Sequence, residues 1–337
     1  MSQQLNGSGA MDEAALREKI TWVTARLSAL RSTIGEVIVG QEAVVEGAII
    51  GLFAGGHVLL EGVPGVGKTM LVRTLASAVN LQFSRVQFTP DLMPTDIVGT
   101  HVLIDDGRGG RSFTFQQGPV FTNILLADEV NRATPKTQSA LLEAMAEGHV
   151  TVGRDTHPLS QPFFVMATQN PLEMEGTYPL PEAQLDRFMF KLDVPFPSRA
   201  ELHEIVVRTV RNELTTVSAV LTGEEILAVR KIALGCPIAH HIVDFAIRIV
   251  EATHGNAKGA QQYLRAGASP RAVQALIVGA KLRALFDGRT NAAIEDIRHL
   301  ATPVLRHRVL LNFDAEADNV NPAQVLETII AEVDRTL

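Results

Sequence analysis

The chain has 337 residues, more than the roughly 100–200 of one typical domain, so we expect two compact domains. Hydrophobic residues make up 46% and charged residues 20%, which excludes a disordered chain, and the single cysteine excludes a disulfide framework or a cysteine-rich metal site. The net charge of −7 disfavours a protein that mainly coats nucleic acid, because such proteins carry a basic surface.

The N-terminal residues are polar and contain glycine and serine, which predicts a flexible tail over residues 1–11. No basic and apolar segments of a secretory signal precede the first helix, and the apolar stretch Ala48–Leu60 is too short to cross a bilayer. We therefore expect no membrane insertion and a cytoplasmic location. Apolar residues recur every three or four positions from Asp12 to Ile34, which predicts an amphipathic helix, and a second helix is predicted over Gln41–Ala54.

Short apolar segments then alternate with predicted helices. The five candidate strands are His57–Glu61, Gln82–Phe88, Ile124–Ala127, Phe163–Ala167 and Phe188–Val194. This alternation predicts a parallel sheet covered by helices on both faces, so we expect an αβα domain over residues 12–197. Turn residues between short alternating stretches predict two inserted hairpins, near residues 101–115 and 149–159.

After residue 197 we expect helices and no further strands. Ser198 with Glu201, and Thr222 with Glu225, have the spacing of capping boxes at helix starts. Ser-Pro at residues 269–270 and Asn-Pro at 321–322 place a capping residue before a proline in the first turn. These signals predict a smaller, all-helical domain over residues 198–337.

A glycine-rich loop follows the first predicted strand. It fits the pattern G-x-x-x-x-G-K-[ST] with the residues Gly62, Val63, Pro64, Gly65, Val66, Gly67, Lys68 and Thr69. Backbone N–H groups of such a loop, and the N-terminus of the helix after it, bind a polyphosphate. We expect Lys68 to contact the β- and γ-phosphates of ATP and Thr69 to be a ligand of Mg²⁺.

Polar side chains follow two further strands. The segment Asn123–Glu129 is a buried strand that ends in two carboxylates. We expect Asp128 to bind the Mg²⁺ shell and Glu129 to polarise the water that attacks the phosphate. Asn170, just after the fourth strand, is placed to hydrogen-bond that water or the γ-phosphate, although Asn-Pro is also a common turn.

These motifs, in this order and with Val39, Gly40 and Gln41 before the first strand, resemble those of AAA+ ATPases. The chain is similar to the MoxR family over roughly residues 35–310. The segments that carry this similarity are LLADEVNRA, KTQSALLEAM, ATQNP and EGTYPLPEAQLDRF. The resemblance implies a P-loop NTPase domain followed by a helical lid, with the nucleotide between them. It also implies ATP hydrolysis that drives a chaperone-like remodelling or activation of partner proteins.

The resemblance also implies roles for single residues. Val39–Gln41 would lie against adenine, and Asn170 would be the sensor 1 residue. Arg187 would be the arginine finger given to a neighbouring subunit, and Arg271 the sensor 2 residue at the start of a lid helix. Arg132, beside the two carboxylates, is an alternative contact to the neighbour's nucleotide, and the sequence leaves that choice open.

The resemblance implies a ring, most simply a hexamer, and a partner with a von Willebrand factor A domain; the client is not specified by the sequence. Two other motors stay open, a helicase-like one driven by nucleic acid and a subunit like that of magnesium chelatase. The acidic charge counts against nucleic acid. A regulatory subunit that binds ATP without turnover is also possible in principle, but the complete set Lys68, Asp128, Glu129 and Asn170 counts against it.

Overall fold

The structure is a computed structural model, and it describes residues 13–105, 111–171, 176–210 and 217–335. The predicted tail over residues 1–11 and the turn of the first predicted hairpin, at 106–110, lie outside the described residues.

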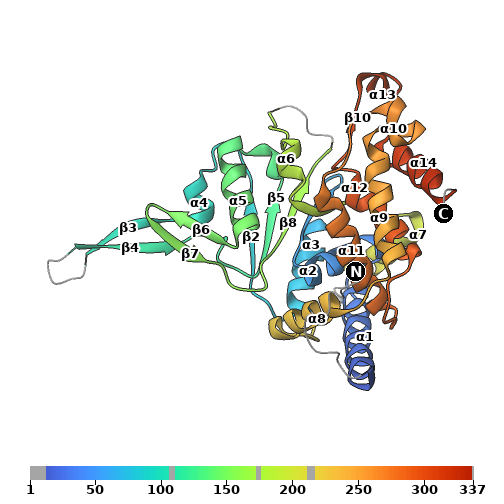
Figure 1. Ribbon diagram of the computed structural model, residues 1–337. Coiled ribbons are helices and arrows are strands. Elements are labelled where there is room, and N and C mark those ends of the chain that lie inside the picture. Colours follow the sequence, from blue (N-terminus) through green and yellow to red (C-terminus); the bar gives the residue numbers. More distant parts are fainter. Residues whose placement is uncertain (1–12, 106–110, 172–175, 211–216, 336–337) are drawn as a thin grey trace, which may run out of the picture.

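A five-stranded sheet forms the centre of the first part of the chain (Figure 1). Its strands are β1 (His57–Glu61), β2 (Phe83–Gln87), β5 (Ile124–Asp128), β8 (Phe164–Gln169) and β9 (Phe188–Asp193). Their order across the sheet is β2-β5-β8-β1-β9, and all neighbouring strands are parallel. The predicted parallel sheet is confirmed, and every predicted strand end lies within two residues of the observed one.

The sheet is buried on both faces. Successive side chains of a strand point to opposite faces, so each strand contributes to two separate cores. In β5, Ile124 and Leu126 enter one core, whereas Leu125 and Ala127 enter a second, smaller core. The larger core is covered by α1 (Glu13–Gly35), α2 (Glu42–Ala54) and α3 (Lys68–Ala78), and the smaller one by α4 (Pro94–Val98) and α5 (Pro135–Glu147). This is the expected αβα arrangement.

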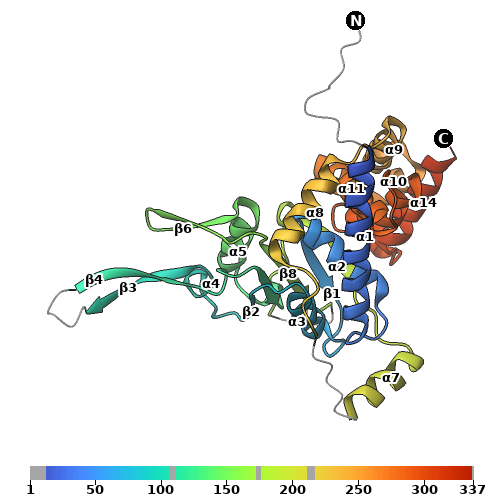
Figure 2. The same cartoon turned by 90° about the horizontal axis from the view of Figure 1, so that it is seen from below.

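Both predicted hairpins are present. They consist of β3 (Gly99–Asp105) with β4 (Arg111–Gln117), and of β6 (His149–Val152) with β7 (Asp155–Pro158). Figures 1 and 2 show that the β3–β4 ribbon extends away from the sheet. At its base the ring of Phe115 stacks on His157 of the second hairpin, with ring centroids 3.9 Å apart. The two hairpins are therefore joined at this point.

The chain after residue 197 is mainly helical. Its helices are α7 (Arg199–Val210), α8 (Gly223–Gly235), α9 (His240–Glu251), η2 (Ala252–Asn256), α10 (Lys258–Tyr263), α11 (Pro270–Phe286), α12 (Ile294–Leu305), α13 (Phe313–Ala317) and α14 (Pro322–Asp334). Both predicted capping boxes form, at the starts of α7 and α8. One short antiparallel pair, β10 (Leu264–Ala266) with β11 (Leu310–Leu311), was not predicted.

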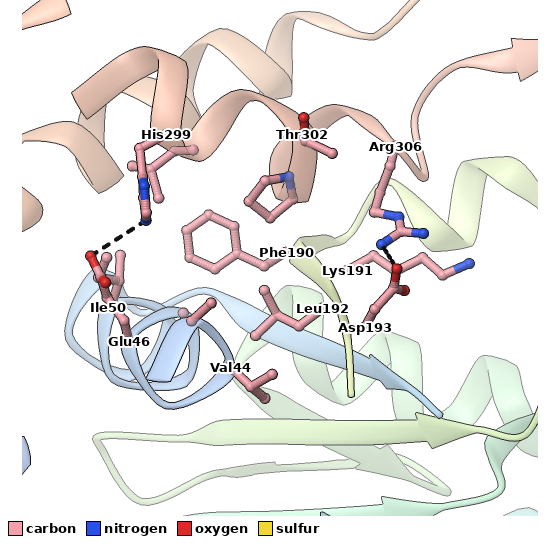
Figure 3. A pocket seen from close by; sticks show the side chains of 14 residues that line it. Val44, Glu46, Ile50, Phe190, Lys191, Leu192, Asp193, His299, Thr302 and Arg306 are labelled. Atoms are coloured by element: carbon pink, nitrogen blue, oxygen red, sulfur yellow. Dashed lines mark ion pairs between the residues drawn. The ribbon is translucent and has the colours of Figure 1, made fainter. Parts of the chain in front are cut away.

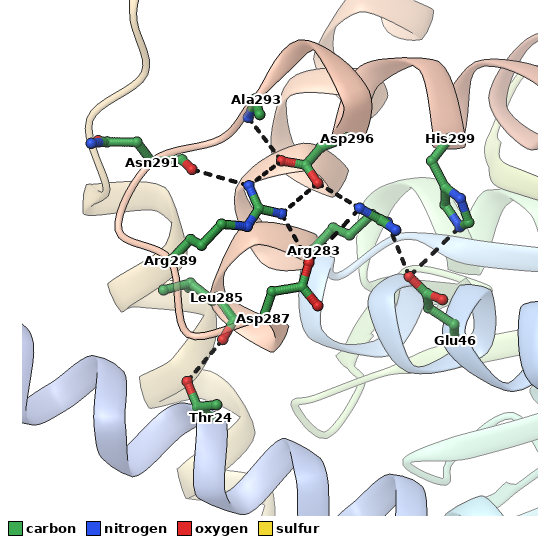
Figure 4. Close-up of polar contacts among 10 residues, drawn as sticks. All are labelled: Thr24, Glu46, Arg283, Leu285, Asp287, Arg289, Asn291, Ala293, Asp296 and His299. Carbon is green, nitrogen blue, oxygen red and sulfur yellow. Dashed lines mark hydrogen bonds and ion pairs between the residues drawn. The ribbon is translucent and has the colours of Figure 1, made fainter.

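The helical region is packed firmly against the sheet region. The larger core runs without a break from α2 and β9 into α11 and α12. Figure 4 shows polar contacts at the same boundary: Glu46 of α2 pairs with Arg283, and Thr24 of α1 donates a hydrogen bond to the carbonyl oxygen of Leu285. Division into two domains at residue 197 stays a prediction, since one core includes residues from both sides.

No single helix among the described residues has the length and apolar character needed to span a bilayer. α8 and the α9–η2 segment reach that length and hydropathy only when they are counted together, and the chain bends by 97° at the break between them.

Candidate nucleotide-binding site

The glycine-rich loop joins the end of β1 to the start of α3 at Lys68. Gly65 and Gly67 have φ angles of 84° and 86°, in the left-handed region that side chains with a Cβ rarely adopt. A Cβ built on either residue would meet no atom within 4 Å. The backbone conformation therefore requires glycine here, and the space a side chain would take stays open to a ligand.

This loop faces the carboxyl ends of β2, β5 and β8 across a cavity of about 530 Å³. That size falls within the range of small-molecule sites. The lining residues are Pro64, Gly65, Gly67, Lys68, Thr69, Met70, Arg73, Arg85, Asp128, Glu129 and Asn170. The cationic loop, the two carboxylates and the asparagine thus share one cavity, and an open glycine cradle opposite carboxylate oxygens fits a polyphosphate with Mg²⁺.

Asp128 and Glu129 are both fixed by Thr168 of β8. The Thr168 hydroxyl donates to Oδ1 of Asp128 at 2.6 Å, and its oxygen accepts the backbone N–H of Glu129 at 2.8 Å. Glu129 has a φ of 55°, a strained conformation for a residue other than glycine, asparagine or aspartate. The backbone therefore turns sharply at the point where β5 delivers its carboxylates to the cavity.

The carboxylate of Glu129 has two donors in the same chain. Gln87 Nε2 donates to Oε2 at 2.7 Å, and Arg132 Nη1 donates to the same oxygen at 2.8 Å. Arg132 therefore contacts the Glu129 carboxylate of its own chain. Sequence reasoning missed Gln87 and its strand neighbour Arg85, although their positions two residues apart on a predicted strand place both on one face.

The remaining loop residues are held by backbone contacts. Lys68 Nζ donates to the carbonyl oxygen of Gly62, and Gln41 Nε2 donates to that of Val66 at 2.9 Å. Val39 and Gly40 line a separate cavity of about 170 Å³ that also includes side chains of α7. The structure thus ties the predicted adenine segment to the P-loop through Gln41, but not into the lining of the main cavity.

Arg187 and Arg271 lie elsewhere. The lining of the main cavity contains no residue of the described helical region, where the lid was expected to cover the nucleotide. Arg187 donates to the carbonyl oxygen of Leu142 in α5. Arg271 lies 3.5 Å from Asp186, the residue before Arg187, and Asp186 also accepts from the buried Arg308 at 2.9 Å. Arg271 therefore contacts the residue that precedes Arg187, and neither arginine is among the residues that line the main cavity.

A further cavity, of about 200 Å³, lies between α2, β9 and α12 (Figure 3). The carboxylates, the lysine and the arginine in its lining are all paired: Glu46 with Arg283, Asp193 with Arg306, and Lys191 with Glu61. Because the charges of this cavity already neutralise one another, it has less to offer an ionic ligand than the main cavity.

Comparison with known proteins identifies the family. The family model described as "ATPase family associated with various cellular activities (AAA)" matches residues 57–190, and the model "AAA lid domain" matches residues 256–329. The chain is 45% identical over 304 residues to Chaperone MoxR1 of Mycobacterium tuberculosis, covering 89% of this chain and 80% of that protein. It is 30% identical over 308 residues to Protein MoxR of Paracoccus denitrificans, covering 86% and 89% of the two chains.

The fold has a solved counterpart. A crystal structure of a protein from Cytophaga hutchinsonii superposes with a TM-score of 0.88 at 40% sequence identity, over 96% of this chain and 98% of that one. Sequence, fold and the composition of the cavity agree, so this chain belongs to the MoxR family of AAA+ ATPases.

Proposed function

We propose that this ATPase binds ATP with Mg²⁺ in the main cavity and completes each catalytic site with arginines from a neighbouring subunit. In this proposal, hydrolysis drives chaperone-like remodelling of partner proteins. The observation that carries the proposal is the convergence of Lys68, Thr69, Asp128, Glu129 and Asn170 on one cavity.

Phosphoryl transfer needs little covalent chemistry from a protein, so positioning and charge neutralisation account for most of the rate. Lys68 binds the β- and γ-phosphates, and Thr69 and Asp128 hold Mg²⁺, which supplies further neutralising charge. Glu129 orients the attacking water and accepts its proton, while Asn170 donates a hydrogen bond to that water or to the γ-phosphate.

The positions of Arg187 and Arg271 support action on a neighbour's nucleotide. Arg271 pairs with Asp186 and Arg187 donates to Leu142, and neither is among the residues that line the cavity of its own chain. Arg132, in contrast, is ion-paired with Glu129 of its own chain at 2.8 Å. This contrast favours Arg187 and Arg271 over Arg132 as the arginines supplied in trans.

Mixed rings test this arrangement. Lys68→Ala and Arg187→Ala chains should each release little phosphate alone, since one lacks the phosphate contact and the other the arginine. Mixing them creates some interfaces that join an intact P-loop to an intact Arg187, so part of the activity should return. Arg335→Ala, which removes an exposed arginine at the end of α14, is the matched control and should keep full activity.

Mass measurements must accompany the mixing experiment. If mixed rings form and phosphate release does not recover, Arg187 does not act in trans, and the same experiment with Arg132→Ala becomes decisive. The hexameric ring, a partner with a von Willebrand factor A domain and a cytoplasmic location are further parts of the proposal that rest on family resemblance. The two alternative motors, one driven by nucleic acid and one like magnesium chelatase, are not favoured by the relatives.

A further inference from the structure

Arg85 lies where the metal is expected. It is on β2, the edge strand, whose register places Gln87 opposite Asp128 of β5. Two donors of Arg85 reach Oδ2 of Asp128, Nη2 at 2.7 Å and Nε at 3.1 Å. The Arg85 side chain is 47% exposed and lines the cavity, whereas that of Asp128 is only 12% exposed. The half-exposed guanidinium of Arg85 therefore covers the almost buried carboxylate of Asp128.

Both oxygens of Asp128 already have a partner. Oδ1 accepts the hydroxyl of Thr168 at 2.6 Å, and Oδ2 accepts from Arg85. A metal ion held at this carboxylate would lie close to the Arg85 guanidinium, and two cations at one carboxylate repel each other. Binding of one disfavours binding of the other.

Arg85 also reaches the second carboxylate indirectly. Its Nη2 donates to Oε1 of Gln87 at 2.8 Å, and the amide nitrogen of Gln87 donates to Glu129 at 2.7 Å. Arg85 therefore fixes which way the Gln87 amide faces, and that orientation holds Glu129. A single guanidinium links the residue of the metal site to the residue that orients water.

We propose that Arg85 is a positioning residue that serves as an internal counterion of Asp128 and is displaced when Mg²⁺ arrives with the nucleotide. The inference rests on the proposed use of this cavity for ATP with Mg²⁺. It makes the affinity of the site for the metal depend on Arg85, and not on the metal ligands alone.

The test measures the Mg²⁺ concentration that half-saturates binding of a fluorescent, non-hydrolysable ATP analogue to the full chain. Arg85→Gln should lower this midpoint roughly fivefold, the change that corresponds to about 1 kcal/mol for a partly exposed ion pair. Arg85→Lys keeps a cation beside Asp128 and should stay near the midpoint of the unaltered protein. Arg335→Gln, which removes an exposed arginine at the end of α14 and outside the cavity, is the matched control and should change the midpoint less than twofold.

Two further measurements separate this role from a general effect on binding. In EDTA, Arg85→Gln should bind the analogue no more tightly than the unaltered protein, because no metal competes. In an Asp128→Asn background, Arg85→Gln should no longer shift the midpoint, because the oxygen for which the cations compete has lost its charge. Thermal unfolding of the nucleotide-free variants shows that each is folded, as expected for a half-exposed side chain on an edge strand.

An unchanged or higher Mg²⁺ midpoint in Arg85→Gln would overturn the inference, as would an equal shift in Arg335→Gln or persistence of the shift in the Asp128→Asn background. Those results leave the proposed function intact if the unaltered protein binds the analogue and Lys68→Ala does not. Failure of the unaltered protein to bind the analogue at any Mg²⁺ concentration would overturn the proposed function, and this inference with it.

Discussion

A buried histidine at the start of β1 should make the stability of the protein depend on pH. His57 is 7% exposed; its Nδ1 accepts the backbone N–H of Val165 at 3.0 Å, and its Nε2 lies 3.0 Å from the carbonyl oxygen of Met145. Since Nδ1 accepts, the proton of the neutral ring is on Nε2 and is donated to Met145. Burial lowers the pKa of His57 from 6.5 to about 4.

The sign and size of the effect follow from this difference in pKa. Between pH 6.5 and 4 the unfolded chain binds a proton at His57 and the native protein does not, so stability is lost as pH falls through this range. At pH 5 the unfolded histidine is almost fully protonated and the native one almost neutral, which corresponds to about 2 kcal/mol relative to pH 7.5.

The assay compares the free energy of unfolding in urea at pH 7.5 and pH 5 for the unaltered protein and for His57→Gln. A glutamine side chain offers an amide donor and a carbonyl acceptor but does not titrate. The loss between the two pH values should be about 2 kcal/mol smaller in the variant, whereas other titrating groups, including the buried His307, contribute to both proteins alike. Equal losses in the two proteins would refute the reasoning.

The remaining predictions concern the chemistry, the helical region and the surface. Glu129→Gln should bind ATP normally and lose phosphate release, and phosphate release like that of the unaltered protein would remove Glu129 from the mechanism. Asp296→Asn should lower the free energy of unfolding by about 2–4 kcal/mol, because the fully buried Asp296 carboxylate accepts from two arginines, whereas the exposed Asp314→Asn should change it little; chemical denaturation checks both. Cys236 should react slowly with a thiol reagent until denaturant is added, because it is buried and burial raises the pKa of its thiol. ATP hydrolysis should not be stimulated by DNA at moderate salt, and a severalfold stimulation would revive the helicase-like alternative.

Local patterns were sufficient to predict most of the fold. Apolar runs that end in acidic residues marked β1 and β5, because a strand buried on both faces needs no alternation. The other three strands were predicted from short segments with apolar residues, which alternate with predicted helices. The β10–β11 pair escaped prediction because its strands are only three and two residues long, and no turn joins residues 264–266 to 310–311. Such a pair depends on the tertiary arrangement that brings its two strands together, and not on a local pattern.

Some residues of the site could likewise be predicted from the local sequence, whereas others could be found only from the tertiary structure. Lys68 and Thr69 are positioned by the strand, loop and helix next to them, so a motif was enough to predict their places. Arg85 belongs to the site only because β2 pairs with β5, and no local pattern specifies that register. Ser269 shows the converse: its place before Pro270 predicted a helix start, which is correct, but its hydroxyl donates to Asp186 and not to the helix.

The continuous larger core also limits how one subunit can change shape. A Cβ on Gly47 of α2 would come within 2.7 Å of Leu192 in β9, and one on Gly279 of α11 would come within 2.7 Å of Leu300 in α12. Elements packed this closely slide past one another only at a high cost in free energy, because well-packed interiors deform little. If the proposed ring forms, we therefore expect each subunit to rotate largely as one rigid body during the ATP cycle, with the change of shape concentrated at the contacts between subunits. Work on a client would then come from the changing geometry of the whole assembly and not from a flap that swings within one chain.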